Sequence, residues 1–250
     1  MLAHPWEAHP MDNRFVNKLR GLAQLGSADV GALAAATSRP RKVAARRDLI
    51  REGDRPGPVI VVLEGWACRY KILPSGTRQV LAFLMPGDSC DLHAGLLAEM
   101  DHSIQTIGPA LVATIERAEM DAIMDNQPAV ARAMYTSQLI DEGTMRAWIT
   151  SMGRRSSIER VAHLMCELYL RARNIHLTSE TELDLPLSQS LLADALGMTP
   201  VHLNRVLRSL RESGAMTLRR GCLRIVDPMM LVKIAGFDEN YLHRRLRAAA

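Results

Sequence analysis

The stretch between Leu185 and Met216 constrains the fold of this chain more than any other part of it. Ser188 stands where an N-cap belongs, ahead of a run with a helical apolar stripe. Gly197 suits the left-handed conformation that ends such a helix, and Thr199 can cap a second helix that begins with Pro200. The apolar stripe of that second helix comprises Leu203, Val206, Leu207 and Leu210. The pattern predicts two short helices joined by a tight turn.

Two short helices joined by such a turn are the signature of the helix-turn-helix motif, whose second helix enters the major groove of DNA. The segments Met216–Leu218 and Cys222–Val226 predict a strand pair with a basic tip, which reads as a β-wing. A plain αα-hairpin would explain the helices, but not the caps, turn and basic wing together. We expect phosphate contacts at the caps and the wing, and base contacts at the start of the second helix. The expected DNA-binding residues are Ser188, Gln189, Thr199, Pro200, Val201, His202, Asn204, Arg205, Arg208, Arg219 and Arg220.

The distribution of charge along the chain agrees with a polyanionic partner for this region. Residues 151–250 hold 15 Arg or Lys against 10 Asp or Glu, whereas residues 1–150 hold 16 against 17. The basic excess of the chain therefore lies in its C-terminal part, as expected if that part meets nucleic acid.

Glycines recur every eleven or twelve residues between positions 53 and 87, mostly within turn sequences. Short apolar runs lie between them, and in one of these Trp66, Cys68, Tyr70 and Ile72 alternate with other residues at the period of a half-buried strand. Short strands at this spacing predict an antiparallel sandwich or barrel-like roll.

Residues 128–152 have no Gly/Pro cluster, and their apolar residues fall at helical steps after the break around Pro128. A helix of that length, about 37 Å, usually packs one face on its own domain and another on a partner. The alternative is a helix buried within one chain. The residues expected at a homodimer interface are Leu139, Glu142, Met145, Trp148, Ile149 and Met152. A break at 153–156 follows, and Ser156 or Ser157 can cap a further helix over Ile158–Arg173.

These predictions combine into an α+β fold with an N-terminal antiparallel, jelly-roll-like β-roll, a long dimerisation helix and a C-terminal winged helix-turn-helix. The expected boundaries are a flexible arm at 1–14, a sensory domain at 15–127, the dimerisation helix at 128–152, the DNA-binding domain at 153–228 and a helical extension at 229–250.

This order of elements resembles the Crp/Fnr family of bacterial regulators over roughly residues 15 to 228. The most specific segments are LIREGD (49–54), the PGD turn (86–88), GRRSSIERVAHLMCEL (153–168) and LADALGMTPVHLNRVLRSLRESG (192–214). The resemblance implies a homodimer on near-palindromic double-stranded DNA, a signal sensed in the roll, and contact with RNA polymerase.

The sensor residues depart from two known types within that family. Members that bind cyclic AMP carry a Gly-Glu pair and then an Arg-Ser pair, and by spacing these positions are Asp91-Leu92 and His102-Ser103 here. Oxygen-sensing members use an N-terminal cysteine cluster, yet residues 1–67 contain no cysteine. We therefore expect an unknown small-molecule effector other than cyclic AMP and predict no cofactor. The residues expected around its pocket are Arg69, Arg78, Asp91, Leu92, His102 and Ser103.

Other functions remain as alternatives at this stage. Cys90, His93 and His102 lie in the expected pocket segment, so a haem or metal site is one of them. The chain could also be a cyclic-nucleotide-binding or redox-sensing module in which DNA binding is secondary. No enzyme motif occurs, and no two of the four cysteines lie within twenty residues of each other. The apolar run Val59–Leu63 is far shorter than the about 20 residues of a membrane span, so we expect a cytoplasmic protein.

Overall fold

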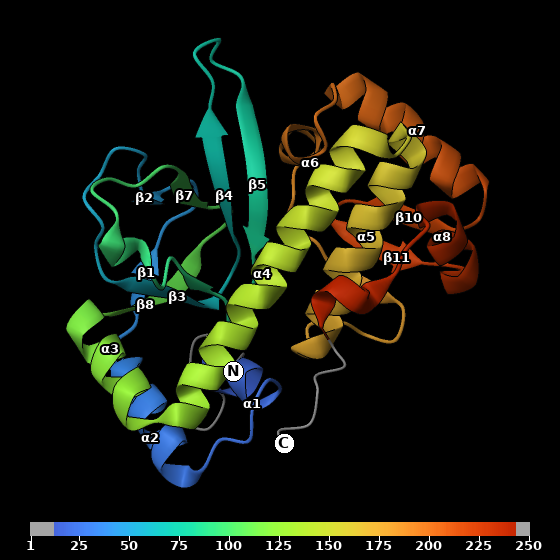
Figure 1. Ribbon diagram of the computed structural model, residues 1–250. Coiled ribbons are helices and arrows are strands. Elements are labelled where there is room, and N and C mark those ends of the chain that lie inside the picture. Colours follow the sequence, from blue (N-terminus) through green and yellow to red (C-terminus); the bar gives the residue numbers. More distant parts are fainter. Residues whose placement is uncertain (1–12, 244–250) are drawn as a thin grey trace, which may run out of the picture.

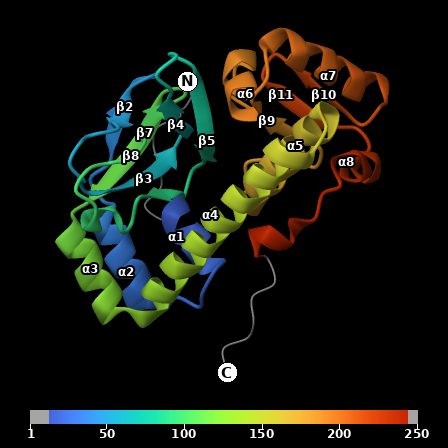
Figure 2. The same cartoon turned by 45° about the horizontal axis from the view of Figure 1, so that its top comes forward.

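The computed structural model describes residues 13–243, so nearly all of the predicted flexible arm at 1–14 lies outside the described residues. An N-terminal β-roll and a helical C-terminal domain lie on either side of the long helix α4 (Pro128–Arg154) (Figures 1 and 2). This arrangement confirms the predicted fold class. No helix within residues 13–243 is both long and apolar enough to cross a membrane.

The β-roll consists of two four-stranded sheets whose paired neighbours are all antiparallel. One sheet has the order β1 (Arg41–Val43), β8 (Ala110–Ile115), β3 (Val59–Glu64), β6 (Ser89–Cys90). The other has the order β2 (Asp48–Ile50), β7 (Ser103–Thr106), β4 (Ala67–Ile72), β5 (Arg78–Leu84). Side chains from both sheets share a core that includes Ile60, Val62, Ala67, Leu84, Ile104 and Val112.

The recurring glycines of the sequence lie where the chain turns. They are Gly53, Gly65, Gly76 and Gly87, and all four have positive φ angles, between 78° and 93°. At Gly65 a side chain is excluded as well, because a Cβ atom would lie 2.5 Å from the carbonyl oxygen of Pro109. The alternation expected along β4 holds for Trp66, Cys68 and Tyr70, which are buried. It fails at Ala67, which is also buried, and at Ile72, which is the last residue of β4 and is 57% exposed.

Helices close one end of the roll. They are α1 (Arg14–Arg20), α2 (Ser27–Ala36), the short η1 (Ala94–Leu96) and α3 (Arg117–Asn126). Phe15 and Leu19 of α1, Met120 of α3 and Met134 of α4 share one buried cluster with Ile115 of β8. The start of α4 is thereby anchored on the sensory domain.

The break predicted after the long helix is real but short. Helix α4 ends at Arg154, and Arg155 has extended backbone angles. Helix α5 (Ser157–Asn174) then begins, capped by Ser156, whose side chain and that of Glu159 form a reciprocal capping box. Of the two serines considered from the sequence, Ser156 is therefore the cap.

The C-terminal domain packs α5, α6 (Gln189–Leu196), α7 (Pro200–Glu212) and α8 (Pro228–Ala235) with a three-stranded sheet and the short η2 (Glu239–Leu242). The sheet order is β10 (Met216–Arg219), β11 (Cys222–Ile225), β9 (Glu182–Asp184). Leu231 and Ala235 of α8, within the segment expected as an extension, join the same core as Leu192, Leu203 and Leu210. Strand β9 has only three residues, and the sequence pattern does not predict it.

Candidate DNA interface, dimer face and effector pocket

Helices α6 and α7 are terminated as the sequence predicts. The Ser188 hydroxyl accepts a hydrogen bond from the backbone N–H of Leu191, and the Thr199 hydroxyl accepts one from that of His202, each at 3.2 Å. Between the helices Gly197 is left-handed, with φ 61°. These caps leave the start of α7 on the outer side of the domain, while α6 lies beside β5 (Figures 1 and 2).

All eleven residues expected to bind DNA are exposed. Val201 is 62% exposed, and within the described residues Arg205 has no side-chain hydrogen bond or ion pair. Arg208, in contrast, donates to Glu212 one turn along α7, at 2.8 Å. The start of α7 thus presents an apolar side chain and a free guanidinium, which are the groups that read a thymine methyl and a guanine edge.

Other polar residues of this face hold each other in place. The Asn204 amide donates to Gln189 Oε1 at 3.0 Å, which joins α7 to α6. His202 Nε2 lies 2.7 Å from the Ser157 hydroxyl at the start of α5. These contacts hold base-reading candidates at fixed positions before any partner arrives.

The wing is a tight hairpin in which Arg219 pairs with Cys222 across the two-residue turn Arg220-Gly221. Both turn residues have positive φ, 50° and 80°, which is the backbone of a type I′ turn. The turn places Arg220 at the tip, exposed to solvent.

Helix α4 carries an exposed apolar stripe on the side opposite its buried face. Leu139, Met145 and Ile149 are 52%, 53% and 66% exposed, and Glu142 on the same stripe pairs with Arg146. Tyr135 is not among the interface residues predicted from the sequence, but it extends the stripe and is 52% exposed. These residues recur at helical spacing, so they form one continuous face.

Two residues expected in the dimer interface point into their own chain instead. Trp148 packs edge-on against Phe83, with ring centroids 5.9 Å apart, and its indole N–H donates to Glu167 at 3.0 Å. Met152 packs against Gly197 of the helix-turn-helix. Both lie about a quarter to a third of a turn away from the centre of the exposed stripe, where the C-terminal domain covers α4.

A cavity of about 820 Å³ lies between the roll and α4. Of the six expected effector-pocket residues, Arg69, Asp91, Leu92 and His102 line it. Two lie elsewhere. The Ser103 hydroxyl accepts from the backbone N–H of Glu52, and Arg78 reaches α6, where its Nη2 lies 2.7 Å from Asp194 Oδ2. Strand β5 faces α6 at this point, which is why Arg78 joins the two domains rather than entering the cavity.

The polar wall of the cavity is a compact charged cluster. Asp91 Oδ1 lies 3.2 Å from Arg69 Nη2 and 3.3 Å from His102 Nε2. His102 Nδ1 lies 2.6 Å from Asp101 Oδ1. Burial opposes the charged form of His102, but hydrogen bonds and charges from Asp91 and Asp101 hold its pKa above the usual value. Burial likewise opposes the charged form of Asp91, and His102 and Arg69 hold its pKa below the usual value.

The three residues considered for a haem or metal site have separate surroundings. Cys90 is buried in the roll, His93 stacks on Tyr135 with ring centroids 6.1 Å apart, and His102 belongs to the charged cluster. Residues 13–243 contain no group of three His, Cys, Asp or Glu side chains placed to hold a metal ion.

A second charged chain of contacts fastens α5 to the roll. Arg171 Nη2 donates to the Phe83 carbonyl oxygen at 2.8 Å and to Asp88 Oδ2 at 3.1 Å. Asp88, from the PGD turn, also pairs with Lys18 at 2.6 Å. At its other end Arg171 pairs with the fully buried Glu167, which accepts from Trp148 and Tyr241. Only the Glu167–Arg171 pair, four residues apart on one helix, follows from sequence spacing.

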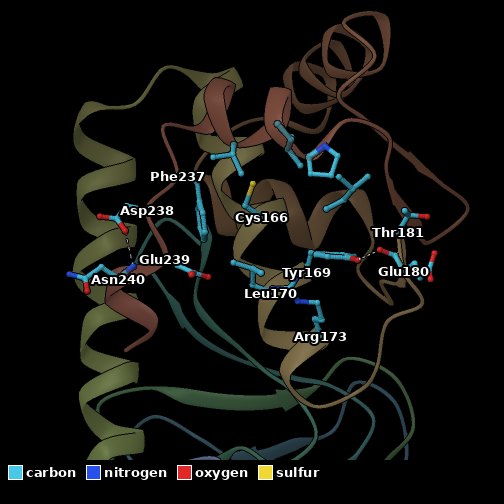
Figure 3. Close-up of a pocket in the computed structure, with 14 residues that line it drawn as sticks. Cys166, Tyr169, Leu170, Arg173, Glu180, Thr181, Phe237, Asp238, Glu239 and Asn240 are labelled. Atoms are coloured by element: carbon cyan, nitrogen blue, oxygen red, sulfur yellow. Dashed lines mark hydrogen bonds between the residues drawn. The ribbon is translucent and has the colours of Figure 1, made fainter. Parts of the chain in front are cut away.

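A further pocket of about 560 Å³ lies within the C-terminal domain, between α5, α8 and the segment after α8 (Figure 3). Its wall includes Cys166, Leu170 and Phe237, and Tyr169 donates from its hydroxyl to the Glu180 carbonyl oxygen at 2.6 Å. Burial raises the pKa of the Cys166 thiol to about 12, so this cysteine is a neutral packing residue. None of the expected site residues lines this pocket.

Two family models match the two domains. Residues 40–127 match the cyclic nucleotide-binding domain, and residues 159–234 match the Crp-like helix-turn-helix domain. Together these matches cover the strands of the roll and nearly all of the C-terminal domain.

Similar whole proteins are regulators. The chain is 28% identical over 221 residues to the nitrogen fixation regulation protein FixK of Azorhizobium caulinodans, covering 87% of this chain and 88% of FixK. It is 24% identical over 204 residues to the transcriptional activator protein FnrL of Cereibacter sphaeroides, covering 80% and 82%. The fold resembles that of FixK2 from Bradyrhizobium japonicum with a TM-score of 0.71 and 22% identity, over 78% of this chain and 96% of that one. The chain belongs to the Crp/Fnr family of DNA-binding transcription regulators and is not an enzyme.

Proposed function

We propose that this regulator binds a specific, near-palindromic DNA site as a homodimer and that its β-roll responds to a signal other than cyclic AMP. The observation that carries the DNA-binding part is the capped helix pair with eleven exposed candidate residues, among them the free guanidinium of Arg205. In this proposal Arg205, Asn204 and His202 read base edges, Val201 contacts a thymine methyl, and the caps and wing hold phosphates.

The exposed stripe on α4 supports the homodimer. Leu139, Met145 and Ile149 are each more than half exposed, although Met145 and Ile149 also line the cavity. A two-fold axis along this stripe would bury it against its own copy, in the self-complementary manner of a C2 interface. Two α7 helices related by that axis would read half-sites about 34 Å apart along the DNA.

The composition of the charged cluster argues against cyclic AMP as the effector. Leu92 cannot accept the ribose hydroxyl, and His102 stands where a guanidinium would hold the phosphate. The guanidinium that does lie nearby, on Arg69, is already paired with Asp91. A cyclic phosphate needs charge-assisted partners to replace its hydration when buried, and this cavity has few to offer.

Two further parts of the proposal rest on family membership. Regulators of this family contact RNA polymerase, and a protein that reads chromosomal DNA and meets the polymerase works in the cytoplasm. The similarity to FixK and FnrL over more than four fifths of those proteins' lengths supports both.

Selection of bound duplexes from a random pool tests the proposed function directly. We expect enrichment of a two-fold symmetric sequence with half-site centres about 10 base pairs apart, and protection of both half-sites in footprinting. Enrichment of no sequence, or of a single asymmetric half-site by a protein that sediments as a monomer, would contradict it.

A further inference from the structure

Asp91 lies in the left-handed backbone conformation, which is uncommon outside glycine but which aspartate and asparagine tolerate. Its φ is 58°, in the left-handed region that glycine occupies freely and that other L-residues occupy at a cost. The guanidinium of Arg117 fixes this loop by donating to the carbonyl oxygens of Asp91 and Leu92, at 3.3 and 3.2 Å. These two hydrogen bonds hold the loop, and with it the Asp91 side chain, in one position.

In that conformation the Asp91 carboxylate contacts the guanidinium of Arg69 and the imidazole of His102 on the cavity wall. Oδ1 contacts Arg69 Nη2 at 3.2 Å and His102 Nε2 at 3.3 Å, and the Asp91 side chain is only 9% exposed. The second oxygen, Oδ2, is buried and has no hydrogen-bond partner. One carboxylate thus contacts both a guanidinium and an imidazole, which are joined to each other by a hydrogen bond from Arg69 Nε to His102 Nε2 at 3.1 Å, and it keeps one unused acceptor.

From this geometry we propose that the Asp91 carboxylate is a built-in anion that fills the anion site of the β-roll, so that the roll reaches its DNA-binding form without an anionic effector. The inference rests on the proposed function and specifies its regulation. An anion attached to the chain has a high effective concentration at its site. A free phosphate or carboxylate must therefore displace Asp91 or lie beside a like charge, and the wild-type site is closed to anions.

The balance of charge around the site supports this assignment. Without Asp91, the wall would present Arg69 beside His102, and His102 would keep one carboxylate neighbour, Asp101. Asp101 would still pair with His102, but the guanidinium of Arg69, which donates from Nε to His102 Nε2 at 3.1 Å, would lose its carboxylate. A buried charge without a counter-ion is costly. Either a built-in or a bound anion removes that cost, and the chain supplies one.

The decisive variant is Asp91→Gly, because glycine suits the positive φ and removes only the carboxylate. DNA affinity is measured by fluorescence anisotropy at constant ionic strength, with potassium chloride replaced in steps by potassium acetate or phosphate, and separately with cyclic AMP added. Asp91→Asn is the matched control, since asparagine tolerates this backbone and fills the site without the charge. Asp91→Gly combined with Arg69→Met removes both the built-in anion and its main partner.

We expect Asp91→Gly to bind the selected DNA at least about tenfold more weakly in chloride, and acetate or phosphate to restore most of that loss. Wild type, Asp91→Asn and the double variant should show no such rescue, and cyclic AMP should leave the wild type unchanged. As a readout independent of DNA, acetate or phosphate should raise the Tm of Asp91→Gly by about 3 °C or more over its effect on the wild type.

Three results would overturn the inference. They are a wild-type DNA affinity that rises tenfold with cyclic AMP or phosphate, an Asp91→Gly protein that binds DNA as tightly as wild type in chloride, and an Asp91→Gly protein that stays unfolded in every anion. Failure of the proposed function looks different, because then the wild type selects no DNA sequence at all.

Discussion

The DNA face and the roll interior both carry arginine, histidine and acidic or amide side chains, but the two regions use them in opposite ways. On the DNA face all eleven candidate residues are exposed, and Arg205 has no partner within the described chain. In the roll, Arg69, Asp91 and His102 are largely buried and contact one another, which leaves only Asp91 Oδ2 of this group buried without a hydrogen-bond partner. A buried polar group must be hydrogen-bonded within the folded protein, whereas an exposed one is hydrogen-bonded by water until a ligand binds. The comparison indicates that the DNA face is free to bind a ligand. In the roll, by contrast, the carboxylate of Asp91 already occupies the place that we propose for an anion.

The largest effect should come from separating the two DNA faces of the proposed dimer. Met145→Glu combined with Ile149→Glu places two charges in the exposed stripe of α4, and we expect monomers in sedimentation. Each monomer then holds a single half-site, so affinity for the full site should fall by about 100-fold or more.

Ala35→Glu combined with Ala122→Glu is the matched control for that variant. It adds the same two charges at exposed positions of α2 and α3, and should leave the sedimentation and the DNA affinity near those of wild type. Wild-type protein that is already monomeric at micromolar concentration, or a control that dissociates equally, would show that the stripe is not the interface.

Replacement of Arg205 tests whether the open guanidinium reads sequence. Arg205→Ala should cost about 1–3 kcal/mol at the selected site and relax preference at one base position. Binding titrations against the cognate duplex and its single-base variants measure this. An equal loss on cognate and scrambled duplexes would assign Arg205 to phosphate instead.

Arg220 at the wing tip should show the opposite behaviour. Because its φ is 50°, Arg220→Asn keeps the turn intact where Ala would strain it. We expect several-fold weaker binding to every sequence and a salt-dependence slope reduced by about 1. Arg39→Gln, which removes one exposed charge from the roll, is the control and should leave the slope unchanged.

The sequence made the DNA face predictable because its signals are local. Caps at Ser188 and Thr199, the left-handed Gly197 and the turn at Arg220 each act within a few residues. The strands after glycine turns were predictable for the same reason, and the family resemblance supplied their assembly.

What the sequence could not show depends on contacts between distant residues. The partners Arg69, Asp91 and His102 are up to 33 positions apart, and Arg78 and Asp194 are 116 apart. Trp148 and Met152 match the helical period of the interface, but only the packing of the C-terminal domain on α4 turns them inward. Side chains with suitable spacing can thus have partners that spacing does not reveal.

The pH dependence of protein stability tests whether His102 is paired with the carboxylates of Asp91 and Asp101 in the folded roll. The pKa of His102 is raised above its usual value of 6.5 in the folded protein. Its contribution is therefore fully present below pH 6.5 and is lost as pH rises through the folded pKa. In denaturant unfolding, the stability difference between wild type and His102→Gln should be largest near pH 6 and shrink toward pH 8.5. A difference that is constant or grows with pH contradicts this.

The smallest expected effect concerns the ion pair that joins the roll to the helix-turn-helix within residues 13–243. Arg78 Nε and Nη2 lie 2.8 and 2.7 Å from Asp194 Oδ2, and both side chains are 30% exposed. Partial exposure weakens the pair through solvent screening, so a double-mutant cycle of Arg78→Ala and Asp194→Ala should give a coupling of about 0.2–1 kcal/mol that falls with salt. The cycle at Arg224 and Glu182, an exposed pair 3.7 Å apart on the neighbouring strands β11 and β9, is the control and should give less. If the first cycle gives no coupling at low salt, then the two regions are held together by their shared apolar core and by Arg171, and a change in the roll must reach α6 by packing alone.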